Sequence, residues 1–118
     1  MGTNLQQEIK SREGTKLRKD LEVIGRILFK PWRIRIFYEV YKTGLENPRR
    51  GLSGYELARL TKKQISTVYT FLHEMESYGV FEFLDKVNNV KKVKITNYGI
   101  QIYGKIKDII SPFYDFLM

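Results

Sequence analysis

The sequence predicts a mainly α-helical domain that carries one small β-hairpin. Over most of the chain, large apolar residues recur at spacings of three and four, which is the repeat of one helix face. Between residues 80 and 96 the repeat changes to the alternation of two strands, with Asn88-Asn89 at their turn. Pro31 and Gly79 stand where one repeat ends and the next begins, as helix-start and helix-end residues do. The predicted class is therefore α+β, with helices on both sides of the hairpin.

Length and composition indicate one globular domain. The 118 residues, 42% of them hydrophobic, are enough for one core and too few for two. The chain has no cysteine and a single histidine, His73, so we expect no disulfide, no metal site and no cofactor. It has no apolar run of the roughly 20 residues that a membrane span needs, and its polar first residues do not resemble a signal peptide. We therefore expect a cytoplasmic, nucleoid-associated protein without a membrane partner.

The charge is strongly positive. The formal net charge is +8 and the isoelectric point is about 9.7. Basic residues outnumber acidic ones over residues 1–50 and 91–118, whereas the middle of the chain is nearly balanced. A small protein with this balance suits a polyanionic partner, and nucleic acid is the commonest one. Charge that faces a nucleic acid must then come mainly from the flanks of the central helices.

Two helices are expected in the first part of the chain. Residues 1–14 carry few large apolar groups and are expected to form a frayed or loosely helical arm, and a helix follows over 15–30. The apolar stripe of this helix consists of Leu17, Leu21, Ile24 and Leu28. The stripe could cover the domain's own core or pack against a second subunit, and the sequence leaves both open. Pro31 begins the next helix, which is expected to end near Gly44.

A helix-turn-helix follows. Ser53 and Glu56 form a capping box, in which the serine oxygen accepts from the Glu56 N–H and the glutamate reaches back. The polar turn over residues 61–64 separates this short helix from a longer one, which is expected from Ile65 to Tyr78. Gly79 ends the longer helix as its C′ residue.

The hairpin and a last helix complete the chain. Residues 80–84 and 91–96 are expected to pair as strands, and in the second of these apolar residues alternate with lysines, so one face is buried and the other is charged. Thr96 caps the last helix, which is expected to span residues 97–118. Its apolar stripe consists of Tyr103, Ile106, Ile110 and Phe113.

This order of elements is that of a winged helix-turn-helix domain, and several short motifs resemble the MarR, ArsR and PadR types of transcriptional regulator. The motifs are Glu56-Leu57-Ala58, Ser66-Thr67-Val68, Gly79-Val80-Phe81, Ile95-Thr96 with Gly99, and Pro31 with Arg33 and Arg35. They cover roughly residues 31–107, in order and at compatible spacing. Among these regulators the chain is most similar to small archaeal members. We expect one domain over 15–118, with the helix-turn-helix and wing at 31–96. The resemblance also implies a recognition helix at about 65–78 and a wing at 80–96.

The recognition helix carries the prediction of base contacts. At about 100° per residue its large apolar residues share one side of the helix and its hydroxyl-bearing residues share the other. An uncharged, hydroxyl-bearing face suits the major groove, and a plain solvated surface is the alternative. The predicted base-reading residues are Gln64, Ser66, Thr67, Tyr69, Thr70 and His73. Because arginine, lysine and asparagine are absent from the centre of this face, we expect modest sequence discrimination that depends partly on DNA shape.

Basic and polar residues around the recognition helix are the predicted phosphate contacts. They lie in the loop before the short helix, at the N-terminus of that helix, in the turn before the recognition helix, and on the hairpin. The predicted contacts are Arg49, Arg50, Ser53, Tyr55, Lys62, Lys63, Lys86, Lys91, Lys92 and Lys94. Each lysine alone would serve solubility equally well, so the cluster carries the prediction.

Together these observations predict a sequence-preferring regulator of transcription that binds double-stranded DNA as a homodimer. We expect a repressor, because a chain this small has no separate activating domain. The predicted dimer interface consists of Leu17, Leu21, Ile24, Leu28, Tyr103, Ile106, Ile110 and Phe113. No nucleophile–base set, phosphate loop or carboxylate pair indicates an enzyme, and no small-molecule effector is evident. Two alternatives stay open: an architectural DNA-binding protein with little sequence preference, and a winged helix that serves as a protein-interaction module.

Overall fold

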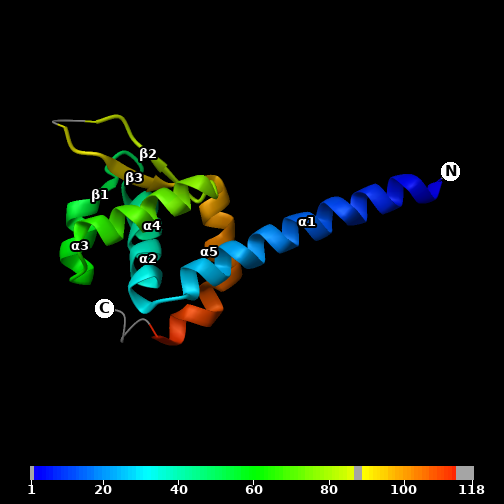
Figure 1. Cartoon of the computed structure of the whole chain (residues 1–118), viewed down its shortest axis with the longest axis horizontal. Helices are drawn as coiled ribbons and strands as arrows, with labels where there is room; N and C mark the ends of the chain where they lie inside the picture. The colour runs from blue at the N-terminus through cyan, green and yellow to red at the C-terminus, as the bar shows by residue number, and fades with distance from the viewer. Residues whose placement is uncertain (1, 87–88, 114–118) are drawn as a thin grey trace.

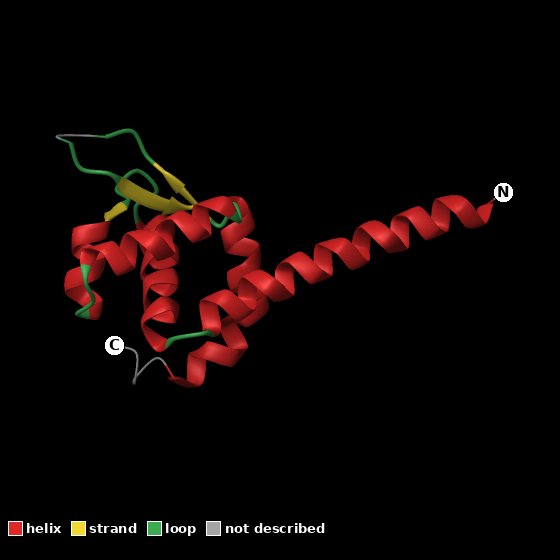
Figure 2. Cartoon of the chain, in the orientation of Figure 1, coloured by secondary structure: helices red, strands yellow, loops and turns green. Residues whose placement is uncertain are grey.

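The computed structural model describes residues 2–86 and 89–113, with side chains over 14–86 and 89–112. Over this part of the chain the elements are α1 (Gly2–Leu28), α2 (Pro31–Glu46), β1 (Leu52–Ser53), α3 (Gly54–Thr61), α4 (Ile65–Ser77), β2 (Phe81–Phe83), β3 (Lys92–Ile95), α5 (Asn97–Ile110) and the 3₁₀ turn η1 (Ser111–Phe113). The predicted α+β class is confirmed, with the hairpin between helices (Figure 2). No helix in the described ranges is long and apolar enough to cross a membrane.

The first helix differs from its predicted bounds. Helix α1 begins at Gly2, well before the predicted start at residue 15, and it continues through Gly14 without a break. One glycine in a helix costs only about 1 kcal/mol relative to alanine, which does not by itself end a helix. Figure 1 shows the N-terminal part of α1 extending away from the rest of the molecule. That residues 1–14 behave as a separate arm stays a prediction.

The buried face of α1 is offset from the predicted apolar stripe. Val23 and Ile27 are fully buried against the rest of the chain, whereas Leu17 and Leu21 are 58% and 68% exposed. The other two residues of the stripe, Ile24 and Leu28, are partly buried and pack at the edge of the core. Among the α1 residues whose side chains are described, Val23 and Ile27 thus belong to the core. Half of the predicted stripe faces outward and the other half lies at the core's edge.

The core lies between α2, α4, α5 and the sheet. Phe37 of α2 stacks on Phe81 of β2 with ring centroids 6.2 Å apart, and Phe71 of α4 meets Phe81 edge-on at 6.4 Å. Helix α5 adds three buried isoleucines, Ile102, Ile106 and Ile110. Burial of these rings and branched side chains is the main source of stability, because apolar surface leaves water.

Helix α2 passes its predicted end. It continues through Gly44 to Glu46. A Cβ atom at Gly44 would lie 2.5 Å from Cγ2 of Ile95 in β3. The glycine therefore permits the close approach of α2 to the sheet and does not end the helix.

The sheet has the strand order β1-β3-β2, and both pairings are antiparallel. The hairpin of β2 and β3 was predicted, and Val93 and Ile95 are buried on one face as expected. Strand β1 was not predicted, because two residues are too few to show an alternation. Its pairing of Leu52 with Val93 joins the start of the helix-turn-helix to the wing. Residues 87–88 of the predicted turn and residues 114–118 of the predicted last helix lie outside the described ranges.

The predicted helix ends of the helix-turn-helix are present. At the start of α3 the Glu56 N–H donates to Ser53 Oγ at 3.1 Å, and the Ser53 N–H donates to Glu56 Oε2 at 3.3 Å, which completes the capping box. After α4, Gly79 adopts a φ of 78°. The N–H groups of Gly79 and Val80 donate to carbonyls of the last turn at 2.9 Å, as in a Schellman motif. The capping residues thus end α4 where the wing begins.

Candidate nucleic-acid interface

Helix α4 presents one polar and one apolar side, as predicted. Its buried residues are Val68, Phe71, Leu72 and Met75, and its exposed residues include Ser66, Thr67, Thr70, His73 and Ser77. The Thr70 hydroxyl donates to the Ser66 carbonyl at 2.9 Å, and the Ser77 hydroxyl donates to the Glu74 carbonyl at 2.6 Å. Because each hydroxyl has only one proton, these two side chains meet an outside partner as hydrogen-bond acceptors.

Tyr69 holds α3 against α4. It is half-buried, and a Cβ atom at Gly54 would lie 2.5 Å from its Cε2 atom. The first residue of α3 must therefore be a glycine for the ring to lie where it does. Tyr69 is consequently at the edge of the exposed face, between the two helices of the helix-turn-helix.

His73 lies between α4 and the wing. Its ring centroid is 4.8 Å from that of Phe83 in β2, and Lys91 Nζ is 5.1 Å from the Phe83 centroid on the wing side. Phe83 thus packs between α4 and the hairpin. This contact was not predicted, although alternation with Phe81 places Phe83 on the inner face of the strand.

The exposed face of α4 is not wholly uncharged. Glu76 is exposed and its Oε1 lies 3.9 Å from His73 Nδ1. The acid stands near the C-terminal end of the helix, so the expectation of an entirely uncharged face is correct for the N-terminal turns only. A polyanion would therefore meet less repulsion at the N-terminal part of α4, where Gln64 and Ser66 are exposed.

The wing lysines are divided between the two faces of the hairpin. Lys91 faces α4 through its contact with Phe83, whereas Lys92 and Lys94 lie on the opposite face. Lys94 Nζ is 3.0 Å from Oε1 of Glu82 on the neighbouring strand. The hairpin lysines were predicted to form one cluster, but the pleat separates them because successive side chains point to opposite faces.

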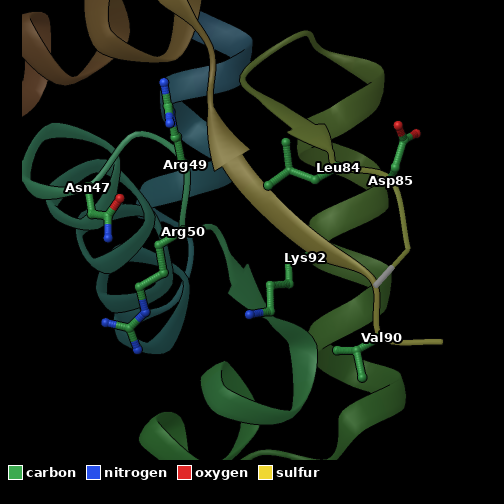
Figure 3. Close-up of a pocket in the computed structure, with 7 residues that line it drawn as sticks. All are labelled: Asn47, Arg49, Arg50, Leu84, Asp85, Val90 and Lys92. Atoms are coloured by element: carbon green, nitrogen blue, oxygen red, sulfur yellow. The ribbon is translucent and has the colours of Figure 1, made fainter. Parts of the chain in front are cut away.

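A basic hollow of about 550 Å³ lies on the face of the hairpin away from α4. Its lining residues are Asn47, Arg49, Arg50, Leu84, Asp85, Val90 and Lys92. Figure 3 shows the Arg50 and Lys92 side chains directed toward the same end of the hollow, while the Arg49 guanidinium points the other way. Cations from two segments far apart in sequence thus meet here, and an anion could be held between them.

The remaining predicted phosphate contacts differ in accessibility. Lys62 and Lys63 are exposed in the turn before α4, and Tyr55 is exposed in the first turn of α3. Lys86 is exposed at the base of the wing tip. Ser53 is buried, with its oxygen engaged in the capping box, so its assignment as a phosphate contact is wrong. The same hydroxyl cannot both stabilise the start of α3 from inside the fold and meet a partner outside it.

The predicted dimer interface is divided by the fold. Leu17 and Leu21 are exposed, and Tyr103 is half-buried with its ring stacked 3.6 Å from that of Tyr41. Ile106 and Ile110 are buried in the chain's own core, so their assignment to a subunit interface is wrong. Helix α5 is apolar around much of its circumference, and periodicity alone did not tell which side faces inward. The side chain of Phe113 lies outside the described residues.

A buried ion cluster joins α1 to α5. Asp20 is 2% exposed, and its carboxylate accepts from Tyr98 Oη and from Lys105 Nζ, both at 2.5 Å. Burial raises the pKa of Asp20, but the hydrogen bonds from Lys105 and Tyr98 outweigh it and hold this pKa below its ordinary value. Burial and the adjacent carboxylate both raise the pKa of Tyr98. No cluster of metal-ligating side chains occurs in the ranges that the structure describes.

A three-helix core with a helix-turn-helix and a three-stranded sheet, whose β2–β3 hairpin is the wing, is a winged helix-turn-helix fold, here extended by α1. Solved structures of transcription regulators share it. The S. aureus MepR–DNA complex has a TM-score of 0.56 and 18% identity, over 92% of this chain and 84% of that one. MepR is described as a transcription regulator of the Staphylococcus aureus multidrug efflux pump MepA. Its structure has a TM-score of 0.57 and 15% identity, over 95% of this chain and 78% of that one. A MarR family transcriptional regulator from Silicibacter pomeroyi DSS has a TM-score of 0.57 and 16% identity, over 96% of this chain and 69% of that one.

At these identities the similarity establishes the fold, which is that of MarR-type regulators. These two neighbours are described as transcription regulators. No protein-family model and no curated protein sequence matches the chain.

Proposed function

We propose that this protein is a transcription regulator, acting as a repressor, that binds double-stranded DNA as a homodimer. The observation that carries the proposal is the exposed polar side of α4, which is bordered by cations of the preceding turn and of the wing. The same fold is present in MepR, whose structure was solved with DNA. In this proposal α4 enters the major groove and the β2–β3 hairpin is the wing.

Base contacts come from the exposed side of α4. The proposed base-reading residues are Gln64, Ser66, Thr67, Tyr69, Thr70 and His73. Thr70 takes part as an acceptor, because its proton is bound to the Ser66 carbonyl. Acceptors match the exocyclic amino groups of adenine and cytosine in the major groove. The side chains at the centre of this face make single rather than bidentate hydrogen bonds, which favours modest sequence preference with a contribution from DNA shape.

Phosphate contacts come from both sides of the hairpin. Lys62, Lys63 and Lys91 border α4, while Arg49, Arg50 and Lys92 surround the basic hollow on the other face. Cations on both faces allow the wing to contact the sugar–phosphate backbone of both strands. Such contacts orient the protein on the duplex and supply most of the salt-dependent affinity.

The proposed dimer contact is the exposed apolar surface of α1, formed by Leu17 and Leu21. Two large apolar side chains one turn apart form a stripe that a twofold partner would cover with its own copy. Two recognition helices about 34 Å apart would then meet successive major grooves. The protein should sediment at twice its 14.0 kDa chain mass, and Leu17→Lys with Leu21→Lys should sediment at the chain mass. A parent protein that stays monomeric at high micromolar concentration would contradict the dimer alone.

The binding test is fluorescence anisotropy with labelled duplex DNA, titrated at several salt concentrations. With about 6–10 phosphates neutralised per dimer, affinity should fall about 10³–10⁵-fold between about 50 and 200 mM salt. Changing Lys63, Lys91 and Lys92 to glutamine should weaken binding to all sequences and reduce the salt slope by about 0.9 for each lost contact.

The control removes the same charge elsewhere. Lys16, Arg18 and Lys107 are exposed on α1 and α5 and are not among the proposed contacts. Changing these three to glutamine should leave the salt slope close to that of the parent. A flat salt response of the parent, or equal losses in both triple variants, would refute the proposed interface.

A separate competition experiment distinguishes the regulator from an architectural DNA-binding protein. A site selected from random duplexes should resist displacement by unrelated DNA if the protein prefers a sequence. Equal displacement by selected and unrelated duplexes would support the architectural alternative. Absence of binding to any duplex would leave the protein-interaction module.

A further inference from the structure

Glu74 turns away from the exposed side of α4 and toward the first two helices. Its Oε1 lies 3.4 Å from Arg26 Nε of α1, and its Oε2 lies 3.7 Å from Arg33 Nη1 of α2. The glutamate side chain is mostly buried, with 22% of its surface exposed. One carboxylate on the recognition helix is therefore shared by arginines from two other helices.

Arg33 is held firmly in this position. Its Nη1 donates to the Arg26 carbonyl at 3.0 Å, and its guanidinium lies 5.1 Å from the ring centroid of Phe71 and 5.5 Å from that of Trp32. A planar guanidinium that packs against aromatic rings loses few further conformations when it binds a carboxylate. The receptor for Glu74 is thus preorganised by α1 and α2 together.

A second contact between α1 and the end of α4 lies one helical turn from the first, toward the N-terminus of α1 and the C-terminus of α4. Tyr78, which follows α4, donates its hydroxyl proton to Oε1 of Glu22 in α1 at 2.9 Å. Glu22 and Arg26 are four residues apart on α1, and Glu74 and Tyr78 are four residues apart at the end of α4. Residues at this spacing lie on the same side of a helix, so the two contacts form successive rungs between α1 and α4.

We propose that these two rungs are a positioning device that fixes the orientation of the recognition helix relative to α1, with Glu74 as the central positioning residue. The inference rests on the proposed function, because α1 carries the proposed dimer contact. An orientation fixed relative to α1 sets the separation of the two recognition helices in the dimer. It therefore determines which spacing of DNA half-sites the protein accepts.

The fold of α4 does not depend on these rungs. Its apolar side is buried in the core through residues such as Phe71 and Met75. Glu74→Gln keeps the size of the side chain and removes its charge, so the variant should fold. Tyr78→Phe removes one hydroxyl, which interacts with Glu22 and with Arg26, and leaves the net charge unchanged. It provides a second variant of different chemistry.

The first experiment measures the dependence of affinity on half-site spacing. The probes are a selected duplex, the same duplex with one base pair inserted between its half-sites, and a single half-site. One base pair moves a half-site by about 3.4 Å along the duplex. Relative to the affinity of each protein for the single half-site, the parent should lose at least about 10-fold on insertion and Glu74→Gln less than about 3-fold. Removal of a negative charge alone would strengthen binding to every probe alike.

The matched control is Glu76→Gln, which makes the same charge change on the same helix without touching α1. It should shift affinity for all three probes by the same factor and keep the spacing preference of the parent. If Glu74→Gln behaves like Glu76→Gln, the positioning role is wrong.

The second experiment does not depend on DNA. The chain has no cysteine, so Arg18→Cys in α1 and Ser77→Cys in α4 can be spin-labelled selectively. Labelled protein is diluted with unlabelled protein so that the electron–electron distance is measured within one chain. The distance distribution should be narrow in the parent and broader in both Glu74→Gln and Tyr78→Phe. Equal distributions would overturn the positioning device, whether or not the protein binds DNA. Broader distributions in a protein that fails to bind DNA would support the device and refute the proposed function.

Discussion

Replacement of Asp20 by asparagine tests the buried cluster that holds α1 on α5. The aspartate is 2% exposed and accepts two charge-assisted hydrogen bonds, from Tyr98 and from Lys105. Asparagine has nearly the same shape and keeps one oxygen that can accept from Tyr98, but it carries no charge to offset that of Lys105. The substitution therefore removes the electrostatic part of the cluster without leaving a cavity.

The expected cost follows from the burial of each partner. A hydrogen bond to a charged group contributes about 1.5–3 kcal/mol. The Lys105 side chain is 43% exposed, so water replaces much of what it loses, and its share must be discounted. We expect Asp20→Asn to lower the free energy of unfolding by about 1.5–3 kcal/mol at pH 7. This corresponds to a decrease of about 6–15 °C in the melting temperature of a domain of this size.

The loss should depend on pH in a defined direction. The pKa of Asp20 in the folded protein lies below its ordinary value of 3.8, so the folded state binds a proton less readily than the unfolded chain. The stabilisation by the carboxylate is then complete above the ordinary pKa and is lost as the pH falls through the lower folded pKa. The parent and Asp20→Asn should accordingly differ fully at pH 7, and their difference in the free energy of unfolding should decrease as the pH falls below 3.8.

Urea unfolding at equal protein concentration, followed by circular dichroism at pH 7 and at about pH 2, measures both differences. Asp108→Asn is the control, because Asp108 is exposed on α5, the helix of Lys105, and its replacement makes the same charge change. It should cost less than about 0.5 kcal/mol. Equal midpoints for the parent and Asp20→Asn at pH 7, or a difference that persists unchanged in acid, would refute this account of the cluster.

Two further predictions concern the helix-turn-helix. Gly54→Ala should displace the Tyr69 ring, because the new Cβ would lie 2.5 Å from its Cε2 atom. Both the melting temperature and the DNA affinity should fall. An unchanged affinity would show that the ring is not needed at the interface. Ser53→Ala should lower the free energy of unfolding by about 1 kcal/mol through loss of the capping box, with no change in the salt slope of DNA binding, because Ser53 is buried. A reduced salt slope for Ser53→Ala would instead indicate that Ser53 contacts a phosphate, against the inference from its burial.

Much of the helix-turn-helix follows from the sequence, because its signals are local. The capping box at Ser53 needs only a residue three positions away, and Gly79 ends α4 through bonds to its own last turn. The separation of the apolar and polar sides of α4 likewise depends only on the 3.6-residue repeat. Such features were predicted and found because every participating group lies within one or two helical turns.

The faces of the terminal helices were decided by the tertiary structure. On α1 two apolar stripes run side by side. The predicted stripe includes Leu17 and Leu21, which are exposed, whereas packing against the rest of the chain buries Val23 and Ile27. On α5 Ile106 is buried in the chain's own core, whereas periodicity had predicted a contact with a second subunit. A helix that is apolar on more than one side has no preferred inner face until its neighbours are in place.

The contacts that organise the proposed DNA-binding surface were also decided by tertiary structure. Strand β1 exists because Leu52 meets Val93, and the ion pair of Arg26 with Glu74 joins residues that are far apart along the chain. Neither contact leaves a periodic signal, because each depends on how two distant segments meet. By itself the sequence determined the order and type of the main elements and the polar side of the recognition helix. Only the tertiary structure determined how that helix is held, because distant side chains become partners only after the core has brought their helices together.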